Sequence, residues 1–173
     1  MPANLRALFL AAILPLSLSA LFSNTSLASH EAQPSRAPRT QGIEPDAGTK
    51  LKLMRIADRQ AANAGIPADF LRAIIRVESD WDAELTGFAG EIGLMQIKPE
   101  TARDMGFRGE DSALYDPETN IRWGAAYLAA AYKLAKGDLC QAVLKYNSGH
   151  QATKMTDAAT AYCGRVRGIL ASN

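Results

Sequence analysis

The sequence IIRVESDW, from Ile74 to Trp81, places an acidic side chain on an apolar helix face. At about 100° per residue, the face that carries Glu78 also carries Leu71, Ile74 and Ile75. The negative end of the helix dipole and the apolar neighbours both disfavour a charged carboxylate there. Glycosidases use such an environment to keep a general acid protonated. The stretch therefore predicts a functional Glu78, and the alternative is a last-turn glutamate that bends into water.

Helix-breaking and helix-capping residues divide the rest of the chain into short helices. Glycines end several of them, and prolines at first-turn positions begin others. The Asp116–Pro117 pair is an N-cap followed by a first-turn proline. Strand-type alternation is almost absent, so the sequence predicts an all-α fold with at most a small irregular or β-like excursion between Trp81 and Gly93. The expected helices span residues 49–64, 67–78, 99–105, 117–136, 139–146 and 157–171.

The first 48 residues are predicted to lie outside the folded domain. A positive start, an apolar run and small residues before Ala28 are typical of a secretory signal peptide over residues 1–28. The alternative is an N-terminal anchor that is not cleaved. Residues 29–48 are rich in proline and polar side chains, which predicts a flexible linker. The remainder, 49–173, has the size of one domain.

Two cysteines, Cys140 and Cys163, lie on the last two predicted helices. A signal peptide implies an oxidising compartment, where an even number of cysteines favours a disulfide. A bridge between them would hold the terminal helix against its neighbour. The alternative is a pair of free buried thiols.

Composition and motifs exclude several classes of function. The chain carries 19 Lys and Arg against 18 Asp and Glu, and a nucleic-acid-binding domain would show a basic excess. Asp80, Asp82 and Glu84 alternate, but they lack the glycine of a calcium loop and are interpreted as solvated loop charges. With two histidines, His30 and His150, far apart, no zinc set is expected. We expect neither a metal nor a cofactor.

An ordered series of motifs resembles one enzyme family. VES (77–79) is followed by GEIGLMQIKPETARDMG (90–106), DPETNIRWGAAYL (116–128) and KYNSG (145–149). This series is similar to the soluble-type lytic transglycosylases of glycoside hydrolase family 23, which have a lysozyme-like fold. The resemblance implies that Glu78 is the single catalytic acid/base. It also implies a sugar groove lined by Met95, Gln96, Tyr146 and Asn147, although core packing is the alternative for Met95 and Tyr146.

The sequence departs from the family pattern at several positions. Gly87 stands where many relatives carry Ser, and Glu91 stands where many carry Ala. Glu91 is a candidate groove residue, with a solvated loop charge as the alternative. Ala158 replaces a glutamate that relatives place before the tyrosine of the last helix, here Tyr162, and the adjacent Asp157 is a candidate substitute.

The resemblance implies cleavage of peptidoglycan glycan strands by a monomeric enzyme in the periplasm. Glu78 would first protonate the glycosidic oxygen and then, as a base, help to close a 1,6-anhydromuramic ring. A lysozyme-type hydrolase is the near alternative, and it needs a second carboxylate, for which Glu91 and Asp80 are the candidates. A wall-binding module without activity is the other alternative. The proline-rich linker is also compatible with a secretion or flagellar assembly.

Overall fold

The structure is a computed structural model that describes residues 45–172, so the predicted signal peptide and most of the predicted linker lie outside the described residues. Within this range the fold is all-α, as the sequence predicts. No helix of the described part combines the length and the apolar character needed to cross a bilayer. The elements are α1 (Ala47–Ala64), α2 (Ala68–Glu78), α3 (Pro99–Asp104), the 3₁₀ helix η1 (Asp111–Tyr115), α4 (Pro117–Leu134), α5 (Leu139–Ser148) and α6 (Asp157–Ala171).

The first helix begins earlier than the sequence predicts. Ala47 and Gly48, assigned to the linker, form the first turn of α1. The reason is Asp46, whose carboxylate accepts hydrogen bonds from the backbone N–H groups of Gly48 (2.9 Å) and Thr49 (3.1 Å). Such N-caps satisfy donors that have no partner inside the helix.

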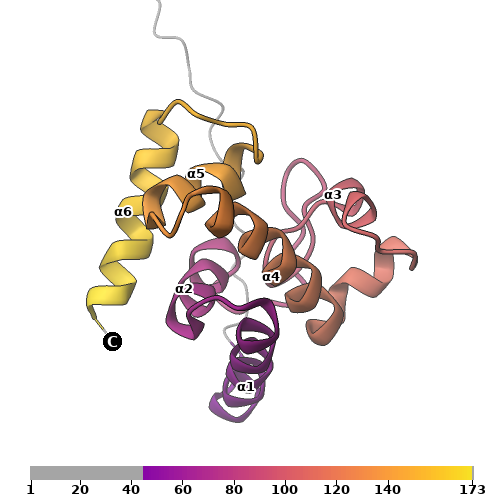
Figure 1. The fold of residues 1–173 in the computed structure, drawn as a ribbon. Coiled ribbons are helices and arrows are strands. Elements are labelled where there is room, and N and C mark those ends of the chain that lie inside the picture. Colours follow the sequence, from indigo (N-terminus) through magenta and orange to yellow (C-terminus); the bar gives the residue numbers. More distant parts are fainter. Residues whose placement is uncertain (1–44, 173) are drawn as a thin grey trace, which may run out of the picture. The chain divides into compact units, whose positions relative to one another are not determined.

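Helix α4 lies at the centre of the domain, between α1 and α5 (Figure 1). It also contacts η1, while α2 packs between α1 and α6. The apolar face of α2 supplies the middle of the core, and Leu71, Ile74 and Ile75 have no exposed surface. This packing fixes the end of α2, where Glu78 lies.

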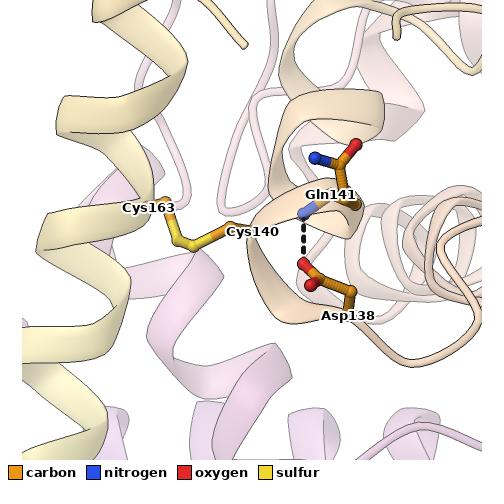
Figure 2. The surroundings of a disulfide bond; sticks show 4 residues. All are labelled: Asp138, Cys140, Gln141 and Cys163. Carbon is orange, nitrogen blue, oxygen red and sulfur yellow. Dashed lines mark hydrogen bonds between the residues drawn. A yellow bond between two sulfur atoms is a disulfide. The ribbon is translucent and has the colours of Figure 1, made fainter. Parts of the chain in front are cut away.

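A disulfide joins Cys140 of α5 to Cys163 of α6, with their Cα atoms 5.3 Å apart (Figure 2). Asp138 caps the start of α5 by accepting a hydrogen bond from the N–H of Gln141 at 2.8 Å. The disulfide closes a loop between two residues with a sequence separation of 23. On the chain-entropy model such a loop stabilises a fold by about 3 kcal/mol. The last helix is thereby tied to its neighbour.

The segment between α2 and α3 is irregular and carries two isolated β-bridges, Thr86 with Ile92 and Ile92 with Ile97. The β-like excursion therefore exists, but it extends a few residues beyond Gly93. The hydroxyl of Ser79, the C-cap of α2, donates to the carbonyl of Leu94 at 2.9 Å. The end of α2 and this segment are thus held together directly.

Candidate active site

Glu78 is the last residue of α2 and is partly exposed, whereas its apolar neighbours on the same face are fully buried. Its Oε1 atom accepts a hydrogen bond of 2.5 Å from the hydroxyl of Tyr162 on α6. Helices α2 and α6 are in contact, so both partners stand on rigid, packed elements. This bond holds the carboxylate in one orientation at the end of the buried face.

Tyr162 is suited to remain a donor to Glu78 at every physiological pH. Only 3% of the residue is exposed. Burial, followed by the nearby Glu78 carboxylate, raises the pKa of the Tyr162 hydroxyl well above its ordinary value of 10.0. The guanidinium of Arg165 lies 5.2 Å above the ring and opposes this shift. The phenol therefore stays protonated.

A cavity of about 450 Å³ opens beside Glu78. Its volume lies in the range of sites that hold small ligands. One wall comes from the ends of α2 and α5 together with α4, and the other from the irregular segment before α3 and from α3 itself. The lining residues are Glu78, Gly87, Phe88, Glu91, Gln96, Ile97, Lys98, Thr101, Tyr127, Tyr146, Asn147 and Gly149.

Five of the six predicted glycan-site residues line this cavity: Glu78, Glu91, Gln96, Tyr146 and Asn147. The sixth, Met95, does not. Its side chain is fully buried and packs so closely on α4 that a Cβ at Gly124 would lie 2.5 Å from its sulfur. The fully buried thioether thus packs in the core, which is the alternative that the sequence leaves open for Met95, and a groove role for this residue stays a prediction.

Tyr146 links α5 to the irregular segment. Its hydroxyl donates to the backbone carbonyl of Met95 at 2.7 Å, so Met95 contributes to the site through its main chain. The ring packs against Tyr127 of α4 at a centroid distance of 5.6 Å. Burial, followed by the charge of Glu78, raises the pKa of the Tyr146 hydroxyl well above 10.0. Tyr146 is thus a neutral donor as well.

The irregular wall is built from a tight turn. The N–H of Gly87 donates to the carbonyl of Glu91 at 2.7 Å, and the N–H of Gly90 donates to the carbonyl of Gly87 at 3.2 Å. Phe88, at the tip of this turn, is 97% exposed. Phe88 also lines the cavity beside Glu78.

Asp80, the other predicted candidate for a second carboxylate, does not line the cavity. It borders a separate hollow together with Arg76 and Arg165. Asp157 is exposed in the first turn of α6 and is not among the cavity residues either. Glu91 is therefore the one carboxylate that shares the cavity with Glu78 among the described residues.

Several site residues were not predicted from the sequence. Tyr162 was noted only as a family position, although a tyrosine on the inner face of the last helix is a signal for a buried hydroxyl that needs a partner. Tyr127 lies on the predicted helix of residues 117–136, to which the sequence assigns no site residue. Lys98 and Thr101 lie inside the motif of residues 90–106 without a role of their own, and Phe88 belongs to no motif.

The helical core, the irregular segment and a glutamate at a helix end define a lysozyme-like domain. The sequence pattern of the family described as "Transglycosylase SLT domain" matches residues 55–162. The chain belongs to this family.

Curated relatives agree with this assignment. The chain is similar to endo-type membrane-bound lytic murein transglycosylase A of Klebsiella pneumoniae, at 40% identity over 86 residues, which cover 46% of this chain and 42% of the relative. The protein of that name from Salmonella paratyphi B is 38% identical over the same length. The chain thus matches less than half the length of these relatives.

Solved structures with a similar fold include the lytic transglycosylase Slt of Pseudomonas aeruginosa, in an inactive variant with a glutamate changed to glutamine. The TM-score is 0.58 at 27% identity, and the match covers 66% of this chain and 22% of that one. The 70-kDa soluble lytic transglycosylase of Escherichia coli gives a TM-score of 0.52 at 28% identity, with 66% and 19% covered.

Proposed function

We propose that this chain is a peptidoglycan lytic transglycosylase that cleaves the β-1,4 bond between N-acetylmuramic acid and N-acetylglucosamine. The observation that carries the proposal is Glu78, which stands at the end of a buried helix, is oriented by Tyr162 and opens into a cavity of ligand size. Family membership and the names of the relatives support the same reaction. Catalysis is assigned to Glu78 alone, without a metal or a cofactor.

The reaction needs one group that is first an acid and then a base. Protonated Glu78 donates its proton to the glycosidic oxygen while the acetamido group of the substrate assists departure of the leaving sugar. The Glu78 carboxylate then removes the proton of the muramic O6 hydroxyl, and O6 attacks C1, which displaces the assisting acetamido oxygen and closes the 1,6-anhydro ring. The hydrogen bond from Tyr162 fits this cycle, because a neutral phenol supports the charged form of Glu78 between the two transfers.

Gln96, Asn147 and Glu91 are assigned to substrate binding, together with the Tyr146 hydroxyl that holds the carbonyl of Met95. The proposal includes action in the periplasm, which the substrate and the expected signal peptide support, and a monomeric state. The curated relatives are named as membrane-bound murein enzymes, which is consistent with that compartment. A dedicated role in a secretion or flagellar assembly would suit the proline-rich linker.

Glu91 supports a second candidate function, a lysozyme-type hydrolase. An inverting glycosidase uses a second carboxylate to activate water on the opposite face of the sugar. Glu91 lies in the same cavity as Glu78, while Asp80 does not. The two candidates differ in the chemistry of their products.

Product analysis separates the two reactions. Purified peptidoglycan is digested with the purified protein, and the soluble fragments are analysed by mass spectrometry before and after borohydride reduction. A transglycosylase releases anhydro ends that resist reduction, and a hydrolase adds one water and leaves reducible ends. We expect anhydro ends. Mostly reducible ends would contradict the transglycosylase proposal, and wall binding without fragments would indicate a binding module.

A further inference from the structure

Position 87 lies in the cavity wall and has no room for a side chain. An ideal Cβ on Gly87 would lie 2.4 Å from Oε2 of Glu91 and 2.7 Å from Oε1 of Gln96. Real Cβ atoms essentially never come this close to another heavy atom. A side chain at position 87 and the present position of the Glu91 carboxylate therefore exclude each other.

The backbone does not require glycine at this position. Gly90, in the same turn, has a φ of 83° and open space around it, so its glycine is required by conformation. Gly87 is not among the residues with positive φ in the described part of the chain. The absence of a side chain at Gly87 thus leaves the space that the Glu91 carboxylate occupies.

The carboxylate of Glu91 is held in place but retains capacity to accept hydrogen bonds. Its Oε2 atom accepts from the N–H of Ala89 at 3.0 Å, and its Oε1 atom lies 3.8 Å from the ammonium of Lys98. A carboxylate has about four lone-pair sites, so these two neighbours leave acceptor positions open. The side chain is 26% exposed and lines the cavity.

Gln96 adds a second acceptor beside the first. Its amide nitrogen donates to the carbonyls of Leu85 (3.0 Å) and Gly93 (2.9 Å), which fixes the orientation of the amide. Its carbonyl oxygen consequently points toward Gly87. Two acceptors that converge on one point of a cavity wall select a ligand that offers hydroxyl or amide N–H donors.

We infer that Gly87 and Glu91 form one specificity-determining unit for the glycan. The empty position at Gly87 admits the carboxylate of Glu91, which joins Gln96 in accepting hydrogen bonds from a hydroxyl or acetamido N–H of the sugar. The inference rests on the proposed function for the identity of the substrate.

A double-mutant cycle tests the coupling, with soluble peptide-free glycan strands as the substrate. We expect Glu91→Ala to raise KM about tenfold with a smaller change in kcat, as for the loss of a hydrogen bond to a charged group. Gly87→Ser should raise KM by a similar factor, because its side chain displaces the carboxylate. In the double variant KM should be no higher than in either single variant. If the two sites acted independently, their increases in KM would instead multiply to about a hundredfold.

Controls separate this role from a structural one. Glu84→Ala removes an exposed acidic residue of the same segment outside the cavity and should leave KM unchanged. Thermal unfolding midpoints of all variants are measured in parallel. Glu91→Gln keeps the shape and removes the charge, so it should raise KM a few-fold even if the Gly87 variants unfold.

The inference would be overturned if KM stays within about twofold of wild type in Glu91→Ala or in a folded Gly87→Ser. It would also be overturned if the increases in KM multiply in the double variant. If Gly87→Ser does not fold, an unchanged KM in Glu91→Gln overturns it. The wild-type protein is assayed alongside, so a failure of the proposed function appears as a wild-type protein that does not cut these strands. That outcome is distinct from altered coupling between two positions in an active enzyme.

Discussion

The two walls of the cavity are built in different ways. On the helical wall, Glu78 and Tyr146 stand on packed helices, and Tyr162 holds the carboxylate from a third. On the loop wall, Gly87 and Glu91 stand on irregular backbone that contains only isolated bridges. Regular packing therefore positions the proposed acid/base, whereas the groups proposed to contact the sugar depend on specific polar contacts within a loop.

The loop wall has its own anchor in the core. Asn120 of α4 is 1% exposed. Its carbonyl oxygen accepts from the N–H of Met95 at 2.8 Å, and its amide nitrogen donates to the carbonyls of Ile92 (2.8 Å) and Leu114 (2.7 Å). One buried amide thus joins the loop and η1 to the central helix. The loop is irregular, but this buried amide connects its backbone to α4.

The largest expected effect is the loss of activity when Glu78, at the end of the helical wall, is replaced. Glu78→Gln should lower the rate of fragment release from peptidoglycan by about a thousandfold, because the acid and the base are the same group. The fold should persist, since a glutamine carbonyl can still accept the hydrogen bond from Tyr162.

Glu84→Gln serves as the matched control, because Glu84 is an exposed glutamate a few residues further along the chain and outside the cavity. It should retain wild-type activity. Activity of Glu78→Gln within tenfold of the wild type would remove Glu78 from the role of acid and base.

The second effect breaks the anchor of the loop wall. Asn120→Ala removes the bonds that Asn120 makes to the Met95 N–H and the Leu114 carbonyl, and one of the two bonds that the Ile92 carbonyl accepts. We therefore expect the free energy of unfolding to fall by about 3 kcal/mol in urea titrations. Asn120→Asp should lower the free energy of unfolding by at least as much, because a carboxylate oxygen would then face the two carbonyls that the amide nitrogen binds. A loss below about 1 kcal/mol in both variants would show that the loop is held by other contacts.

The helical wall can be predicted from the sequence because helices have a regular apolar periodicity and recognisable residues at their ends. Periodicity located α2 and placed Glu78 in line with its buried face, and breakers located the other helices to within a few residues. Prediction from the sequence is weaker in the irregular segment, where residue spacing does not fix the direction of a side chain. The apolar Met95 within GLMQ could point to the groove or to the core, and only the close approach of Gly124 shows that it fills the core.

The relation between Gly87 and Glu91 is another example. The sequence shows two departures from a family pattern, and for one of them, Glu91, a solvated loop charge is the alternative. Their coupling depends on the distance between a glutamate oxygen and an absent Cβ, which no periodicity encodes. The same holds for Tyr162, whose partner Glu78 is 84 residues away in the sequence.

The smallest effect concerns the contact that orients the acid. Tyr162→Phe removes the hydroxyl that donates to Glu78 and leaves the ring in place. We expect kcat to fall about tenfold with little change in KM, because the lost bond supports the charged form of Glu78 within the catalytic cycle. Tyr146→Phe, which loses a bond to a backbone carbonyl instead, is the matched control and should affect KM as much as kcat.

Alkaline unfolding gives a second readout of the same hydroxyl. The pKa of Tyr162 in the unfolded chain is near 10.0, and in the folded protein it is raised well above that value by burial and by Glu78. Above about pH 10 the unfolded chain therefore releases a proton that the folded protein keeps, so stability falls as pH rises. The unfolding midpoint of Tyr162→Phe should fall less between about pH 8 and pH 11 than that of the wild type. Equal declines would show that the folded protein does not hold the Tyr162 proton more tightly than the unfolded chain, and the helical wall would then lack the buried donor that distinguishes it from the loop wall.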